Sequence, residues 1–299
     1  MIHYLFLFIV IALITTQNIA KKQYNLKVEK PNGFTFSAVV ALFAMVFFLI
    51  SVGFKVQFVL AVLPYSMGFA VSYAAALVGT LLAIKWGPLS ITLLVNSYSL
   101  VIPAFYGVIA LNERLTLFKI IGLVLLATSL LLISAVLEKK NDNAVQTQKF
   151  SFKWLVALIF AFLGNGLCST VQKMQNVAFF DKAQNTTLYK NEFMIFALTI
   201  VFVSLVIAAI VNKEDVRTGT LPCVGLAAIT GIANGIVNLL VMILSAPGAM
   251  DASILFPSIS GGGIVLGFLL SFFVYKERLS RLQYVGYAIG TASVILLNL

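Results

Sequence analysis

Charge is what this chain most conspicuously lacks. Only 10% of its 299 residues are charged, whereas a water-soluble protein carries about 25%. Hydrophobic residues make up 61% of the sequence, and the mean hydropathy is +1.04. So few charged side chains cannot cover a surface that faces water. The composition therefore predicts that lipid surrounds most of the chain.

Residues that hold metals or perform catalysis are also scarce. Cys168 and Cys223 are the only cysteines, which is too few for a disulfide framework, and they lack metal-ligand spacing. The single histidine, His3, lies at the N-terminus with nothing nearby that could complete a site. The sequence contains no phosphate-binding loop and no nucleophile–histidine arrangement. We therefore expect no enzyme, no metal and no cofactor.

A net charge of +10 raises the question of a nucleic-acid partner. The basic residues, however, lie almost entirely between apolar runs, as they do in the loops of membrane proteins. The expected partner is therefore a lipid bilayer and not a nucleic acid.

Long apolar runs dominate what is present. About 20 residues of helix cross a bilayer, and these runs lack the alternation of barrel strands, so we expect helices. The first run lacks the basic start and the cleavage site of a signal peptide, which indicates a retained span. Pro64, Pro103 and Pro257 fall inside runs and are expected to bend them. The predicted fold is an all-α integral membrane protein with ten transmembrane helices, near residues 2–20, 34–52, 57–84, 88–111, 116–137, 152–175, 188–211, 221–246, 252–275 and 280–298.

One phrase occurs twice: NERLTLFKIIG at 112–122 and KERLSRLQYVG at 276–286. Other similarities between the two halves follow in the same order along the chain. This order predicts a tandem duplication, with a first five-helix repeat at 1–137, a polar linker at 138–151 and a second repeat at 152–299. The matched pairs are Lys22 and Lys173, Asn25 and Asn176, Gly68 and Gly231, Ser90-Ile91 and Ser253-Ile254, Glu113 and Glu277, Arg114 and Arg278, Leu115 and Leu279, Gly122 and Gly286, and Ser129 and Ser293.

The odd number of helices in each repeat determines the predicted geometry. After five crossings the chain emerges on the opposite side of the membrane, so the second repeat must be inverted. Inverted repeats are typical of secondary transporters, which bind their substrate near the midplane and open alternately to either side.

The duplicated phrase resembles the drug/metabolite transporter superfamily, in particular its EamA-like ten-helix carriers. The resemblance rests on Glu113-Arg114-Leu115-Thr116 with Gly122, on the second copy from Glu277 to Ser280 with Gly286, and on Lys22 and Lys173. It implies ten helices, transport of a small molecule and a location in the plasma (inner) membrane of a bacterium. It does not select among amino acids, nucleotides, sugars and drugs.

The chain departs from this family in two places. Asn112 and Lys276 stand where a glycine usually precedes the glutamate. The first loop, 21–33, is longer and more basic than is usual.

Polar side chains at bilayer depth are costly unless they line a cavity or find partners. The alternative for each is a hydrogen bond between helices, worth about 0.6 kcal/mol. The candidate substrate-binding residues are Gln17, Asn18, Tyr73, Asn96, Tyr98, Asn165, Gln172, Asn234, Asn238, Ser258 and Ser260. Lys22, Lys173 and Glu192 are charged candidates at helix ends, and Gly261, Gly262, Gly263 and Gly267 are expected to act in bending or close packing.

The predicted function is transport of a small polar or amphipathic metabolite by alternating access. Tyrosines among the candidates keep a multidrug-type exporter of lipophilic compounds open. A membrane scaffold or a membrane-embedded enzyme is the alternative of a different class. No carboxylate lies deep in any predicted span, so no coupling ion is assigned, and the chain could act as a monomer or a homodimer.

Loop charge predicts that both termini lie outside. Fourteen lysines and arginines fall in the odd-numbered loops and six in the even-numbered loops, and basic loops favour the cytoplasm. The family resemblance implies the opposite orientation. A cysteine at Asn143, in a chain lacking Cys168 and Cys223, should therefore resist an impermeant maleimide in intact cells. Rapid labelling there would restore the orientation of the family.

Overall fold

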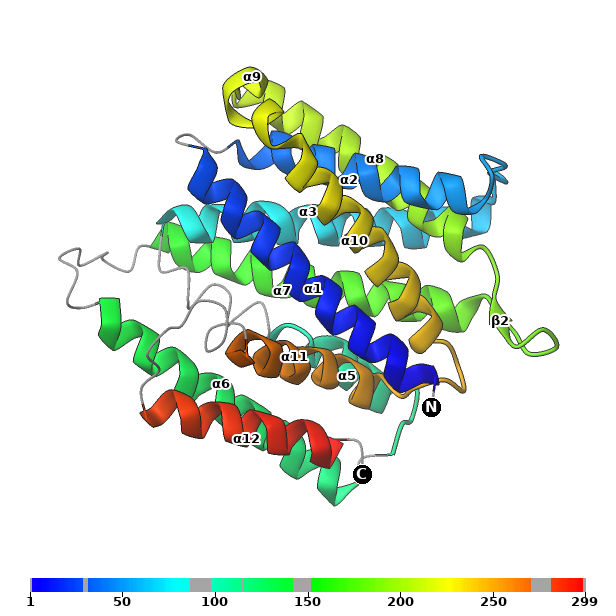
Figure 1. The fold of residues 1–299 in the computed structure, drawn as a ribbon. Coiled ribbons are helices and arrows are strands. Elements are labelled where there is room, and N and C mark those ends of the chain that lie inside the picture. Colours follow the sequence, from blue (N-terminus) through cyan, green and yellow to red (C-terminus); the bar gives the residue numbers. More distant parts are fainter. Residues whose placement is uncertain are drawn as a thin grey trace. The chain divides into compact units, whose positions relative to one another are not determined.

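The computed structural model describes residues 2–28, 32–86, 98–114, 116–141, 152–269 and 281–297. These residues are almost entirely helical (Figure 1), which confirms the all-α prediction. A small antiparallel hairpin, β1 (Phe180–Asp181) with β2 (Thr186–Thr187), is the exception within the described chain.

Six helices in the described chain are long and apolar enough to cross a membrane. They are Ile2–Lys21, Gly33–Ser51, Leu60–Thr80, Phe152–Ala178, Lys190–Val211 and Leu221–Leu244. The other four predicted spans are not established. The runs 88–111, 252–275 and 280–298 lie partly outside the described residues, and the apolar part of the fifth run is the shorter helix Leu117–Ser129. The structure thus has the helices of a multi-pass membrane protein, with six of the ten expected spans present.

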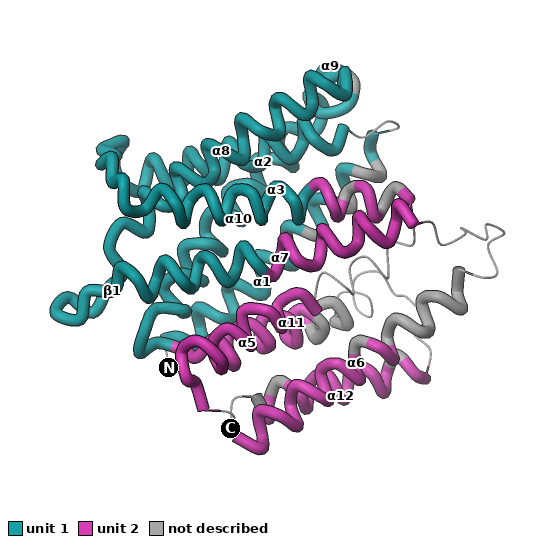
Figure 2. Tube along the Cα trace, turned by 180° about the vertical axis from the view of Figure 1, so that it is seen from behind, with its two compact units in different colours: residues 1–77, 167–249 teal, residues 78–166, 250–299 magenta. Residues whose placement is uncertain are grey.

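The chain forms two compact units (Figure 2). Unit 1 contains residues 1–77 and 167–249, and unit 2 contains residues 78–166 and 250–299. The boundaries fall inside helices α3 (Leu63–Trp86) and α7 (Phe152–Ala178). Each unit therefore combines helices from both predicted repeats.

Unit 1 is assembled around α2 and α10. Its elements are α1 (Ile2–Lys27), α2 (Gly33–Ser51), η1 (Leu60–Val62), the first part of α3, the last part of α7, the hairpin, α8 (Lys190–Val211), α9 (Val216–Gly219), η2 (Leu221–Cys223) and α10 (Val224–Leu244). Helix α10 packs against α1 and α2, and α2 packs against α8. Aromatic side chains fill the centre, where the rings of Phe69 and Phe193 meet edge-on at 5.6 Å.

Two glycines allow α10 to approach α2 closely. A Cβ added at Gly231 would lie 2.5 Å from the Val40 carbonyl oxygen, and one added at Gly235 would lie 2.6 Å from the Phe47 ring. Small residues permit such close approach of helix backbones in membranes. The spacing of these glycines by four residues places both on the face that meets α2.

Helix α1 continues seven residues beyond the expected end at 20, so the first loop is shorter than the sequence suggested. The reason is Tyr24, which is 3% exposed and stacks on Phe36 at 4.0 Å. Its hydroxyl donates to the Gly219 carbonyl at 2.8 Å and accepts from the Asn32 amide at 2.8 Å. Burial raises the pKa of the Tyr24 hydroxyl. The hydroxyl therefore stays protonated and can donate this hydrogen bond.

Unit 2 contains the remainder of α3 and α7, with α5 (Val101–Ala110), α6 (Leu117–Asn141), α11 (Ala252–Leu269) and α12 (Arg281–Leu297). Helix α12 lies along α6, and α11 packs against α5 and α12 (Figure 1). The Ser129 hydroxyl donates to the Gly286 carbonyl at 2.6 Å across the α6–α12 seam. Gly122 and Ser293 are buried as well.

The three prolines expected to bend helices do not share one role. Pro257 lies inside α11 as expected. Pro64 and Pro103 instead occupy the first turns of α3 and α5. A missing N–H costs little there, because the first amides of a helix have no partner within it.

Candidate functional site

Five of the predicted polar residues form one network inside unit 1. Asn238 donates through its side-chain nitrogen to the carboxamide oxygen of Asn234 at 3.0 Å and to the Asn234 carbonyl at 2.9 Å. Asn234 reaches Gln17 on α1 at 3.5 Å, and Gln172 on α7 donates to the Asn238 carbonyl at 3.2 Å. The Tyr73 hydroxyl interacts with the Asn234 side chain. The network therefore joins α1, α3, α7 and α10.

A second polar set lies further along the same two helices, α7 and α10. Lys173 is 3% exposed, and its ammonium donates to the Ser245 carbonyl at 2.8 Å. Ser245 is the C-cap of α10, and a cation at a helix C-terminus is favourable because the carbonyls there carry partial negative charge. Lys173 thus binds the end of α10, which accounts for a lysine at this depth.

Asn176 completes this set, and the sequence did not identify it as a site residue. Its side-chain nitrogen donates to the Met242 carbonyl at 2.8 Å and to the Ser245 hydroxyl at 2.6 Å. Its carboxamide oxygen is buried and accepts no hydrogen bond. Position 176 lies one helical turn beyond Gln172, so α7 presents both carboxamides on one face. That spacing was the signal available in the sequence.

An unpaired buried acceptor is costly, by about 1–3 kcal/mol. The Asn176 oxygen would therefore gain by accepting a hydrogen bond from a small polar molecule. Together with the side chains of Gln17, Tyr73, Asn234 and Asn238, it offers both hydrogen-bond donors and acceptors. These side chains belong to helices that are long enough to span a membrane. This arrangement can bind an uncharged or zwitterionic polar group.

The candidates in unit 2 make local contacts. Asn165 donates to the Ser99 hydroxyl at 2.6 Å, and the Tyr98 hydroxyl donates to the Ala127 carbonyl at 2.5 Å. Tyr98 and Ser260 line a hollow of about 220 Å³ between α5, α6 and α11. Ser258 is fully buried in α11.

The remaining candidates are placed as follows. Glu192 lies in the first turn of α8, where a carboxylate suits the helix N-terminus. Gly261 is buried, whereas a Cβ at Gly263 would touch nothing within 4 Å, so Gly263 leaves open space. Gly262 is half-buried, and Gly267 lies on α11. Asn96, Glu277 and Arg278, and the side chains of Asn18 and Lys22, fall outside the described residues.

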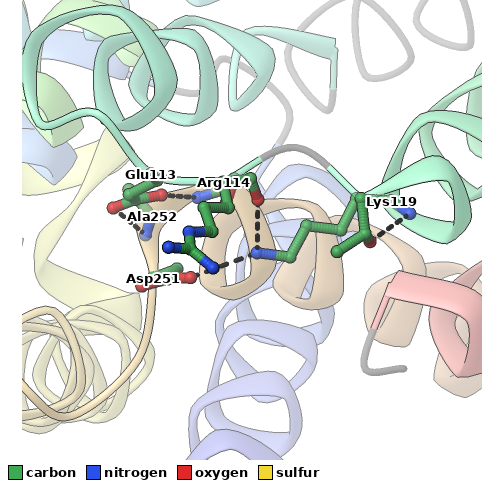
Figure 3. Close-up of polar contacts among 7 residues, drawn as sticks. Glu113, Arg114, Lys119, Asp251 and Ala252 are labelled. Atoms are coloured by element: carbon green, nitrogen blue, oxygen red, sulfur yellow. Dashed lines mark hydrogen bonds and ion pairs between the residues drawn. The ribbon is translucent and has the colours of Figure 1, made fainter.

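The first copy of the duplicated phrase joins three helices (Figure 3). The Glu113 carboxylate accepts from the backbone amides of Ala252 and Ser253 at 2.8 and 2.9 Å, at the start of α11. Lys119 on α6 pairs with Asp251 at 3.1 Å. Thr116 accepts from the Lys119 amide at 3.2 Å and so caps its own helix, α6. The Glu and the Thr of the phrase therefore cap two different helices.

The departure at Asn112 also has a structural explanation. Asn112 has φ 53°, a left-handed conformation that glycine adopts most easily and that asparagine tolerates. The Glu113 amide then donates back to the Gly107 carbonyl at 3.1 Å. Asparagine can therefore replace the usual glycine at this helix end.

A comparable carboxylate lies in unit 1. Glu214, just after α8, accepts from the amides of Phe34 and Thr35 at 3.1 and 2.7 Å and from the Thr35 hydroxyl at 2.7 Å. Phe34 and Thr35 form the first turn of α2, whose N-cap side chain, Asn32, makes no such bond. Asn32 instead bonds to the Asp215 carbonyl. In both units a loop glutamate thus caps a helix other than its own.

Comparison with known proteins establishes a shared fold. No family model matches the sequence, and no curated protein matches it. A solved structure described only as a crystal structure of a protein aligns with a TM-score of 0.74 over 98% of this chain and 95% of its own, at 15% sequence identity. At that identity the similarity concerns the path of the backbone alone.

Proposed function

We propose that this protein is a secondary transporter that moves a small polar or amphipathic metabolite across a membrane by alternating access. The observation that carries the proposal is the hydrogen-bonded network of Gln17, Tyr73, Gln172, Asn234 and Asn238. It lies among membrane-spanning helices, where polar side chains are costly and mark functional paths. The members of the network are carboxamides and one hydroxyl, and they include no carboxylate, histidine or cysteine. Such groups bind a polar solute by hydrogen bonds and supply no acid, base or nucleophile for a reaction.

The helix pairings support inverted repeats as the architecture of this transporter. If α1, α2, α3, α5 and α6 correspond in order to α7, α8, α10, α11 and α12, then α2 matches α8, α5 matches α11 and α6 matches α12. Each of these three pairs lies side by side within one unit, an arrangement that a two-fold axis between the repeats would produce. The contact of α1 with α10 corresponds to a contact of α7 with α3, where a Cβ at Gly79 would lie 2.5 Å from the Ala161 amide.

Substitution in the network tests the proposal. Saturable counterflow of a solute from a broad metabolite panel is expected in proteoliposomes, without nucleotide hydrolysis. Asn238→Ala should reduce the initial rate by roughly tenfold, because it removes about 1.4 kcal/mol or more of polar contact from the proposed path. Asn234→Ala should act in the same direction.

Asn212→Ala is the matched control. Asn212 is exposed at the end of α8 and bonds to the Ala208 carbonyl of its own helix at 2.8 Å. Its replacement should leave transport unchanged. Wild-type rates in both Asn234→Ala and Asn238→Ala, with folded protein in the membrane, would show that the network is structural.

The second candidate function is export of lipophilic compounds, and it rests on unit 2. Hollows of about 260 and 220 Å³ lie between α5, α6 and α11, and apolar side chains such as Val101, Phe105 and Val124 line both. A lipophilic substrate would bind there. Ala104→Trp should then abolish counterflow of a lipophilic compound and spare that of a polar metabolite, since Ala104 lines the larger hollow.

A further inference from the structure

Charged side chains hold the start of α11 in addition to the packing of its buried residues. Glu113 receives the amides of Ala252 and Ser253, and Asp251, the residue before the helix, pairs with Lys119 at 3.1 Å. Lys119 also donates to the Arg114 carbonyl at 3.1 Å (Figure 3). These contacts tie the first turn of α11 to the connection between α5 and α6.

The hollow beside this turn lowers its packing support. Ser253 lines the hollow of about 260 Å³ together with side chains of α5 and α6. The Ser253 side chain is buried, and its hydroxyl has no hydrogen-bond partner. Phe105 and Val124, which also line the hollow, are exposed, so the hollow is open at the protein surface and fewer protein atoms pack against the turn on that side.

The first turn of α11 can also move without breaking the whole helix. Pro257 has no amide hydrogen and cannot donate to the Ser253 carbonyl, four residues earlier. The turn before Pro257 is therefore joined to the rest of α11 by fewer hydrogen bonds, and prolines inside helices are where kinks form.

The contacts that hold the turn are weak enough to open. The Asp251 side chain is 49% exposed and the Lys119 side chain is 8% exposed, so solvent screens the acidic partner of the pair. The Glu113 carboxylate packs directly against Gly107, because a Cβ added at Gly107 would lie 2.5 Å from one of the carboxylate oxygens. Both features suit a contact that breaks and forms again in the same geometry.

From these observations we propose that Glu113, with the Lys119–Asp251 pair, is a releasable latch on the first turn of α11, and that its release opens the hollow between α5, α6 and α11. This inference rests on the second candidate function, the export of lipophilic compounds, for which the hollow in unit 2 is the binding site that the latch closes. The latch itself can be tested without any solute.

Cysteine accessibility measures the opening directly. The purified chain carries Cys168→Ala, Cys223→Ala and the reporter Ser253→Cys, and a small methanethiosulfonate reagent labels it in detergent. The buried reporter should react slowly with Glu113 present. Glu113→Gln keeps the size of the side chain and removes its charge and one acceptor, and labelling should become roughly fivefold faster or more. Asp251→Asn, which weakens the ion pair alone, should also accelerate labelling.

Two controls separate the latch from general loosening. Glu214→Gln removes the corresponding carboxylate at α2 in unit 1 and should leave the labelling rate of Ser253→Cys unchanged. A second reporter, Ser129→Cys, is buried in the α6–α12 seam and should remain unreactive in every variant.

An unchanged rate in both Glu113→Gln and Asp251→Asn would overturn the latch, as would equal acceleration at Ser129→Cys. If Glu113→Gln does not yield folded protein, the result for Asp251→Asn decides. Accelerated labelling in a chain that transports no solute would retain the latch and refute the transporter. Transport of a solute with an unchanged labelling rate in the variants would retain the transporter and refute the latch.

Discussion

Gly231→Ala should destabilise the protein by about 1–3 kcal/mol, the usual cost of overpacking. The new methyl group would lie 2.5 Å from the Val40 carbonyl oxygen and 2.6 Å from the Phe43 Cβ. A backbone oxygen cannot turn aside as a side chain can, so α10 and α2 would have to move apart. Thermal unfolding in detergent should show a midpoint lower by roughly 5 °C or more.

Two other glycines of α10 provide matched comparisons. Gly235→Ala should cost less, because its nearest neighbour is the Phe47 ring, which can rotate. Gly225→Ala should be neutral or slightly stabilising, since no atom lies within 4 Å of its Cβ position and alanine favours the helix by up to about 1 kcal/mol. Equal midpoints for all three variants would contradict the close α10–α2 contact.

Glu214→Ala should destabilise unit 1 by roughly 2–3 kcal/mol. Hydrogen bonds to charged groups contribute about 1.5–3 kcal/mol, and this carboxylate receives two amides and one hydroxyl at the start of α2. Without it the positive end of α2 would lose its compensating charge. The measurement is again the unfolding midpoint in detergent.

Asp215→Ala is the control for this effect. Asp215 is the neighbouring carboxylate, it is exposed, and it caps the four-residue helix α9 by accepting from the Arg217 amide at 3.0 Å. Its removal should cost less than about 1 kcal/mol, because short exposed helices contribute little. A larger loss in Asp215→Ala than in Glu214→Ala would show that the α2 cap is unimportant.

The sequence by itself determined that this is a helical membrane protein. Scarcity of charge and long apolar runs act locally, because each residue contributes to the hydropathy of its own helix. The runs near Gly33–Ser51, Lys190–Val211 and Leu221–Leu244 accordingly reappear as helices with similar bounds. The sequence also identified candidate substrate-binding residues, because polar side chains are rare within apolar spans. These residues are Gln17, Tyr73, Gln172, Asn234 and Asn238.

Other features depended on contacts that no local pattern records. The sequence predicts two successive five-helix repeats, whereas the grouping into compact units, each with helices from both predicted repeats, was visible only in the structure. The spacing of Asn176 from Gln172 was visible in the sequence, but its bonds to Met242 and Ser245, which lie far along the chain, were not. The extension of α1 was missed because Tyr24 is held by Gly219, 195 residues away.

The duplicated phrase shows both contributions in one place. The sequence revealed that Glu113 and Thr116 recur as Glu277 and Ser280. Thr116 caps the helix that follows it, as its position before an apolar run predicts. Only the tertiary structure showed that Glu113 binds the start of α11, 139 residues away in the chain. Capping of a following helix is encoded by neighbours in the chain, whereas capping of a distant helix depends on how the helices pack.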